Sequence, residues 1–142
     1  MRSKVLMLGD TLALFIITLI GFATHGETAI SFWPRLLATF IPLAAGWFLL
    51  APRFGLFTPT PAPPNSHHAP RRGPWREAAQ EAARTAPAML FAGPLAVVLR
   101  GLILNAPIIP IFALVLSTTS ALGLIIWRAL YFVLIRSRPA GH

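Results

Sequence analysis

The chain has 142 residues, of which 56% are hydrophobic and only 11% are charged. Soluble domains carry about 25% charged residues, and a domain of this size could not bury so much apolar surface, so the composition excludes an ordinary soluble globular protein. The net charge of +8 would suit nucleic-acid binding, but the cations gather at the ends of apolar stretches, and we expect no nucleic-acid partner. The chain has no cysteine, which excludes disulfides, thiolate metal sites and thiol catalysis.

Four long apolar stretches divide the chain. A hydrocarbon core about 30 Å thick requires roughly 20 apolar residues per spanning helix, and each stretch is long enough. The sequence therefore predicts an all-α integral membrane bundle, a single membrane domain over residues 1–142. The predicted spans are residues 5–23, 35–54, 86–104 and 107–129. A cleaved signal peptide is the alternative for the first stretch, which follows two basic residues.

The positions of Lys and Arg predict which ends of the spans face the cytoplasm. Of the 12 basic residues, Arg100 falls inside a span and Arg35 lies alone on one side, while the others lie on the opposite side. Cytoplasmic loops retain Lys and Arg, so both termini are expected in the cytoplasm, an N-in/C-in topology. We expect a multi-pass protein of the bacterial cytoplasmic (inner) membrane, in contact with the lipid bilayer.

The segment between the second and third spans has two parts. Residues 58–73 are rich in proline and predict an extended cytoplasmic linker. In residues 74–85, Trp75 and several alanines share one helix face, and charged residues occupy the other. This pattern favours a short interfacial amphipathic helix before the third span, anchored by Trp75. A straight extension of the third span is the alternative, although Pro87 favours a break.

Two charged residues, Asp10 and Arg100, lie inside the apolar stretches, where a charge costs roughly 2.5–3.5 kcal/mol on insertion scales. Such residues usually face the protein interior and pair. Their depths differ by about 12 Å at a rise of 1.5 Å per residue, too much for a direct bridge. We expect Arg100 to pair with Glu27 instead. The depths predict two polar clusters, Asp10, Arg53 and Arg128 on the inner side and His25, Glu27 and Arg100 on the outer side.

These clusters have two interpretations. They fasten the helices together, or they relay protons or ions, as intramembrane carboxylates and histidines do in pumps. The few polar groups, with no ionisable residue near the midplane, favour fastening. Pro42 and Gly93-Pro94 lie inside spans and would suit the interrupted helices of a transporter, but prolines are also common in membrane helices generally.

Short motifs along the chain suggest a family. Gly9-Asp10 opens an apolar helix that ends near Gly21, before the turn His25-Gly26-Glu27. Later come Phe40-Ile41-Pro42, Gly46-Trp47, Arg100 and Trp127-Arg128. Through these residues the chain resembles the bacterial membrane proteins of domain of unknown function 3054, over all four spans. In that family a basic residue often follows the glycine that ends the first span, whereas this chain has Phe22 there. The resemblance implies a small four-helix membrane protein and no particular activity. It also favours a role in the fold for six residues, which are Asp10, His25, Glu27, Pro42, Arg100 and Arg128.

The sequence contains no nucleophile elbow, no His-Glu-x-x-His motif and no glycine-rich phosphate loop. We therefore expect no enzymatic activity, no cofactor and no metal ion. The favoured interpretation is a non-catalytic membrane protein that acts through helix packing, as a homo-oligomer or as an accessory subunit of a membrane complex. The alternative is a small oligomeric transporter or channel for a proton, ion or small solute, which would use Asp10, His25, Glu27 and Arg100.

Overall fold

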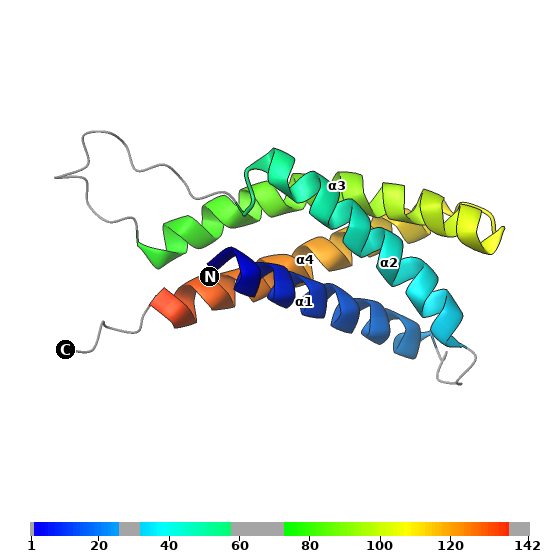
Figure 1. The fold of residues 1–142 in the computed structure, drawn as a ribbon, viewed down its shortest axis with the longest axis horizontal. Helices are drawn as coiled ribbons and strands as arrows, with labels where there is room; N and C mark the ends of the chain where they lie inside the picture. The colour runs from blue at the N-terminus through cyan, green and yellow to red at the C-terminus, as the bar shows by residue number, and fades with distance from the viewer. Residues whose placement is uncertain (1, 26–31, 58–72, 137–142) are drawn as a thin grey trace.

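The computed structural model describes residues 2–25, 32–57 and 73–136 (Figure 1). Within these residues the chain forms four long helices, α1 (Arg2–Thr24), α2 (Trp33–Leu50), α3 (Pro74–Leu104) and α4 (Pro110–Arg136). A short 3₁₀ helix, η2 (Ala51–Phe54), continues α2 and ends at Gly55, whose φ of 72° is left-handed. Except for Gly73, the predicted proline-rich linker lies outside the described residues.

The helices pack as a bundle in which α3 and α4 make the most extensive contact. α2 packs on α3, and α1 packs against both α4 and α2. The beginning of α1, the beginning of α3 and the end of α4 lie at one end of the bundle (Figure 1). We call this the inner end, because the charge pattern predicts that it faces the cytoplasm, and we call the opposite end the outer end.

All four helices are long and apolar enough to cross a membrane. The candidate spans are Ser3–Thr24, Trp33–Phe54, Trp75–Leu104 and Pro110–Leu134. Their number matches the four spans predicted from the sequence; the third begins earlier than predicted, and the fourth begins and ends later. Because a helix satisfies its own backbone hydrogen bonds, it can cross lipid. The chain is an all-α multi-pass membrane protein.

α3 corrects one expectation from the sequence. The predicted interfacial helix at residues 74–85 is not separate, because α3 is one helix of 31 residues with Pro87 and Pro94 inside it. A proline removes one helical hydrogen bond, but membrane helices tolerate this where neighbouring helices pack against the site. Thr85 and Ala88, on either side of Pro87, are fully buried. Packing against the bundle therefore continues past the proline, and the straight extension is the correct alternative.

α1 shows how the sequence separates the bundle interior from the lipid. Its buried residues recur at every fourth position, which places them on one helix face; they are Leu6, Asp10, Leu14 and Thr18. The opposite face carries large exposed apolar side chains, which suit hydrocarbon surroundings; they are Leu8, Leu12, Ile16 and Ile20. This spacing turns Asp10 into the bundle.

Two glycines allow helices to approach closely. A Cβ on Gly9 would overlap the Trp127 ring, and a Cβ on Gly93 would overlap Ser117. Small residues play this role widely at helix interfaces in membranes. The first contact joins α1 to α4 at positions directly before Asp10 and Arg128, so it brings those two charged residues to the same level of the bundle.

Candidate functional site

A buried ion pair joins α1 to α4 in the inner half of the bundle. Arg128 donates from Nη2 to Asp10 Oδ2 at 2.6 Å and from Nε to Asp10 Oδ1 at 3.2 Å. The two parallel bonds match the fork of a guanidinium to the two oxygens of a carboxylate. Only 1% of Arg128 and 0% of Asp10 is exposed.

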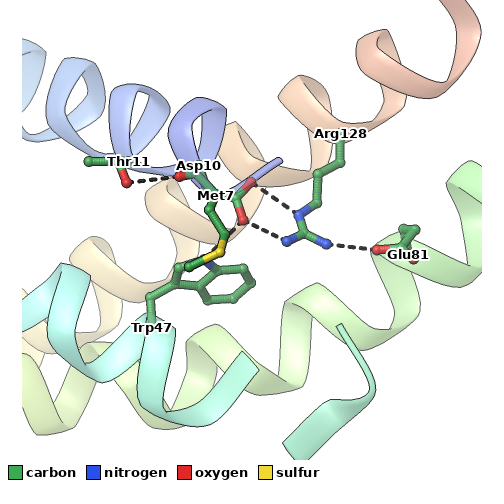
Figure 2. A network of polar contacts seen from close by, with 6 residues as sticks. All are labelled: Met7, Asp10, Thr11, Trp47, Glu81 and Arg128. Carbon is green, nitrogen blue, oxygen red and sulfur yellow. Dashed lines mark hydrogen bonds and ion pairs between the residues drawn. The ribbon is translucent and has the colours of Figure 1, made fainter. Parts of the chain in front are cut away.

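The two remaining helices each add one residue to this pair. Trp47 of α2 donates its indole N–H to Asp10 Oδ2 at 3.1 Å. Arg128 donates from Nη1 to Glu81 Oε2 of α3 at 2.7 Å. Figure 2 shows Arg128 between the two carboxylates, with Trp47 reaching Asp10 from α2. We call Asp10, Trp47, Glu81 and Arg128 the inner network; it links all four helices.

Aromatic rings enclose the Arg128 guanidinium. Its Cζ lies 5.4 Å from the centroid of the Trp47 ring and 4.9 Å from that of Phe57, within the range of cation–π attraction. Phe57 has a φ of 72°, which is rare for a bulky residue. The chain after η2 thus adopts an unfavourable backbone conformation that places an aromatic ring over Arg128. Trp127, which is half-buried, places its buried indole nitrogen beside Asp10.

The inner network compensates charges that the bilayer would otherwise penalise. Removing a carboxylate and a guanidinium from water is costly unless they pair and their remaining hydrogen-bonding groups find partners. Here the Asp10 carboxylate accepts bonds from Arg128 and Trp47, and the Arg128 guanidinium donates to Asp10 and Glu81. Removing one partner of a buried pair costs about 3–5 kcal/mol, because the other charge remains buried.

Arg100 lies in a different setting, near the outer end of α3. It donates from Nε to Thr39 Oγ1 of α2 at 2.9 Å, and its Cζ lies 5.0 Å from the centroid of the Phe112 ring of α4. The Thr39 hydroxyl in turn donates to the backbone carbonyl of Arg35 at 2.9 Å. In the part of the chain that the structure describes, no carboxylate pairs with Arg100.

A cavity of ≈ 430 Å³ opens beside Arg100 and is lined by residues of all four helices. We call it the outer cavity. Its walls are mainly apolar, and its polar lining residues are Thr18, Thr24, His25, Thr39, Arg100 and Thr119. Cavities of this volume are typical of small-molecule binding sites in proteins.

Three leucines separate the outer cavity from the inner network. On α1, Leu14 lies one helical turn from Asp10 and one turn from Thr18. Leu43 on α2 and Leu124 on α4 occupy the corresponding positions, and all three leucines are fully buried. We call them the leucine layer. The polar groups of the two sites are therefore separated by packed apolar side chains.

The structure brings some of the predicted site residues together. Asp10 pairs with Arg128 and not with Arg53, the other partner that the sequence allowed; Arg53 is exposed on η2. Arg100 lies away from Asp10, and His25 lines the same cavity as Arg100. Glu27 lies outside the described residues, so its pairing with Arg100 stays a prediction. Among the described side chains, no three His, Cys, Asp or Glu residues gather as metal ligands would.

Sequence reasoning missed Glu81, Trp47 and Phe57 as partners of the ion pair. The amphipathic pattern puts Glu81 on the polar face of a separate helix. In a continuous α3, however, Glu81 lies one helical turn before Thr85, which is fully buried. The spacing of four residues places both on one helix face, so a helix that continues past Pro87 would have predicted that Glu81 faces the bundle. Phe57 had no comparable signal, because its position depends on the left-handed backbone after η2.

The fold and the two sites define the class of the protein. It is a small multi-pass membrane protein of four helices, with charged residues that form ion pairs inside the bundle. The chain matches the family described as "Protein of unknown function (DUF3054)" over residues 7–131. It belongs to this family, and the match includes every residue of the inner network as well as Arg100. No curated protein and no solved structure matches the chain.

Proposed function

We propose that this chain is a non-catalytic protein of the bacterial cytoplasmic membrane that acts through helix packing, with further copies of itself or with partner subunits. The observation that carries the proposal is the closed inner network. Asp10 and Glu81 both bind Arg128, so these charged groups are engaged in holding the helices together. Charged groups that bind one another in this way stabilise the packing of the helices.

The leucine layer also favours this function over conduction by a single copy. A proton or ion pathway requires polar groups or water in sequence across the membrane. Here Leu14, Leu43 and Leu124 are fully buried between the two polar sites. In this conformation, a solute that entered the outer cavity would meet packed leucine side chains.

The orientation we propose has both termini in the cytoplasm. The start of α1 and the end of α4 lie at the inner end of the bundle (Figure 1), and most Lys and Arg residues outside the spans belong to the same side in the sequence. Such residues are retained in cytoplasmic segments. A stiff bundle with its basic segments in the cytoplasm would present a defined surface to partner helices within the bilayer.

The experiment that tests this function measures association in a bilayer. Because the chain has no cysteine, Ser3→Cys at the exposed start of α1 provides a single labelling position. Donor- and acceptor-labelled protein is reconstituted in liposomes at decreasing protein-to-lipid ratios. A homo-oligomer keeps its energy transfer above the level of random proximity on dilution. An accessory subunit leaves gently extracted membranes in a complex of fixed stoichiometry. A monomer in both measurements would contradict the proposal.

The alternative function is a small oligomeric transporter, and one observation favours it. The outer cavity is lined by charged Arg100 and closed on its inner side by the leucine layer, as one half of an alternating-access site would be. Flux into liposomes that contain a pH-sensitive dye tests it, with Asp10→Asn and Arg100→Gln as variants. We expect no protein-dependent flux. Flux that either variant abolishes, while the protein stays folded, would favour transport over packing.

A further inference from the structure

We propose that the outer cavity binds a monoanion with an apolar body, specifically a monocarboxylate, and that Arg100 holds the carboxylate group. This inference goes beyond the packing function above and does not depend on it. Three properties of the cavity carry it: the hydrogen-bond donors that remain free, the charge of the site and the chemistry of its walls.

The free donors of the cavity belong mainly to Arg100. The threonine hydroxyls in the lining donate to backbone carbonyls of their own helices; they are Thr18, Thr24, Thr39 and Thr119. Arg100 uses Nε to bind Thr39, while Nη1 and Nη2 find no acceptor in the described ranges. These two nitrogens carry four N–H groups. Two of these groups point in parallel from one edge and match the two oxygens of a carboxylate.

Among the described residues no carboxylate pairs with Arg100, so the site carries one positive charge that a monoanion would compensate. If Glu27 pairs with Arg100, as the sequence predicts, it occupies the same donors and the ligand would not bind. The fully buried Asp10 and the partly buried Glu81 are bound to Arg128 on the far side of the leucine layer. An uncompensated ion among apolar groups is unfavourable, and a ligand with one negative charge removes that penalty. A dianion such as phosphate would bring a second negative charge against apolar walls, so the charge favours a carboxylate.

The walls of the cavity select for an apolar ligand body. Ile17, Phe22 and Leu116 line it together with the polar residues. Phe112 packs its ring against the Arg100 guanidinium, which restricts the orientation of that group. A small alkyl or aryl group fits ≈ 430 Å³ and gains free energy in proportion to the apolar area it removes from water.

The carboxylate could come from two sources, water at the outer surface or the outer leaflet of the bilayer. Ile20 on α1 and Val115 on α4 line the cavity and remain 55% and 50% exposed. An alkyl chain longer than the cavity can therefore leave between these two helices. A carboxylate from either source would bind Arg100 in the same way. The two sources are distinguished by how the affinity depends on the length of the ligand's alkyl chain.

The test is calorimetric binding to the full chain in nanodiscs, with octanoate and dodecanoate as probes. Octanol and octylammonium are the matched neutral and cationic controls, and nanodiscs without protein correct for partition into lipid. We expect octanoate to bind, Arg100→Gln to weaken it about tenfold or more, and octanol to be unaffected by the substitution. Tighter binding of dodecanoate indicates the bilayer as the source, and equal binding indicates water.

Two further variants keep the test decisive if Arg100→Gln folds poorly. Arg100→Lys keeps the charge but loses the bidentate fork, so it should bind octanoate with intermediate affinity. Gly21 lines the cavity, and the space around its missing Cβ is open, so Gly21→Leu should weaken octanoate binding without unfolding the protein. Ala23→Leu, at an exposed position of α1 outside the lining, is the matched control.

Specific outcomes would overturn the proposal. They are an absence of octanoate binding to folded wild-type protein, equal binding of octanoate and octanol, and unchanged octanoate affinity in folded Arg100→Gln. The association measurement above is independent of all three. A protein that oligomerises but binds no carboxylate would therefore contradict this inference alone.

Discussion

Arg128 and Asp10, 118 positions apart in the chain, meet in a bidentate ion pair in which both side chains are buried. The pair joins the first helix of the bundle to the last. Helices that follow one another in sequence are held close by the segments between them, but α1 and α4 have no such short connection. The ion pair, and the Gly9 contact with Trp127 beside it, therefore supply the long-range specificity that closes the bundle.

The two carboxylates that bind Arg128 should contribute unequally to stability. Asp10→Ala leaves a fully buried guanidinium with Glu81 alone, and we expect a loss of about 3–5 kcal/mol in unfolding free energy. Glu81 is 18% exposed, and Glu81→Ala leaves the bidentate pair intact, so we expect a loss of about 1–2 kcal/mol. Reversible unfolding by SDS in mixed micelles measures both changes. Arg53→Ala, at an exposed position of η2, should have no measurable effect, and equal losses in the two carboxylate variants would contradict this ranking.

The α1–α4 contact should be sensitive to a single methyl group. A Cβ on Gly9 overlaps the Trp127 ring, whereas a Cβ on Gly21 meets open space on the same helix. Overpacking of this kind typically costs about 1–3 kcal/mol, so Gly9→Ala should lower the melting temperature while Gly21→Ala leaves it unchanged. Because a smaller partner side chain restores the space, Trp127→Leu should recover part of the loss in a Gly9→Ala background. Equal melting temperatures for the two alanine variants would show that the helices do not approach closely at Gly9.

Much of the fold could be predicted from the sequence because a lipid bilayer strongly constrains the sequence of a helix that crosses it. A chain that crosses hydrocarbon must form its backbone hydrogen bonds within itself, so a long apolar stretch predicts a spanning helix. Depth within a span follows from residue count, and this count kept Asp10 apart from Arg100. The same count left Arg53 and Arg128 as partners for Asp10, and only the packing of α4 against α1 distinguishes them.

The parts that the sequence did not predict depend on contacts between helices. Pro87 lies within a helix whose neighbours bury the residues around it, and no local rule gives that outcome. Continuity of α3 then carries Glu81 to Arg128. Phe57 reaches the same guanidinium through a left-handed backbone, which sequence preferences disfavour. The outer cavity likewise arises from the packing of four helices.

The predicted pairing of Glu27 with Arg100 can be tested by thiol crosslinking. The native chain contains no cysteine, so the double variant Glu27→Cys/Arg100→Cys has no background. If Glu27 approaches Arg100, a bismaleimide should crosslink the two cysteines. A flexible crosslinker is needed because an ion pair of two long side chains can hold their Cα atoms farther apart than the roughly 7 Å that a disulfide allows. Gel mobility after protease cleavage between the two positions measures the crosslinking. Glu27→Cys/Asp10→Cys, in which Asp10 lies in the inner half of α1, is the control. No crosslink above this control would contradict the pairing.

The proposed topology predicts which segments a membrane-impermeant reagent reaches. Ser31→Cys, between the first two spans, should be labelled by a maleimide in intact cells. Ser66→Cys, between the second and third spans, should be labelled only after the membrane is permeabilised. The difference follows from the retention of Lys and Arg in the cytoplasm. The reverse pattern would show that the termini face outward.

The most direct test of the central claim, that Asp10 and Arg128 lock the bundle, is a double-mutant cycle in unfolding free energy. Asp10→Leu and Arg128→Met each leave a buried charge without its main partner, whereas the double variant removes both charges and keeps apolar volume. Buried pairs replaced in this way often retain stability. We expect the double variant to be more stable than either single variant, with a coupling energy of about 2 kcal/mol or more. Losses that add within about 0.5 kcal/mol would show that the two residues act independently and would contradict the account.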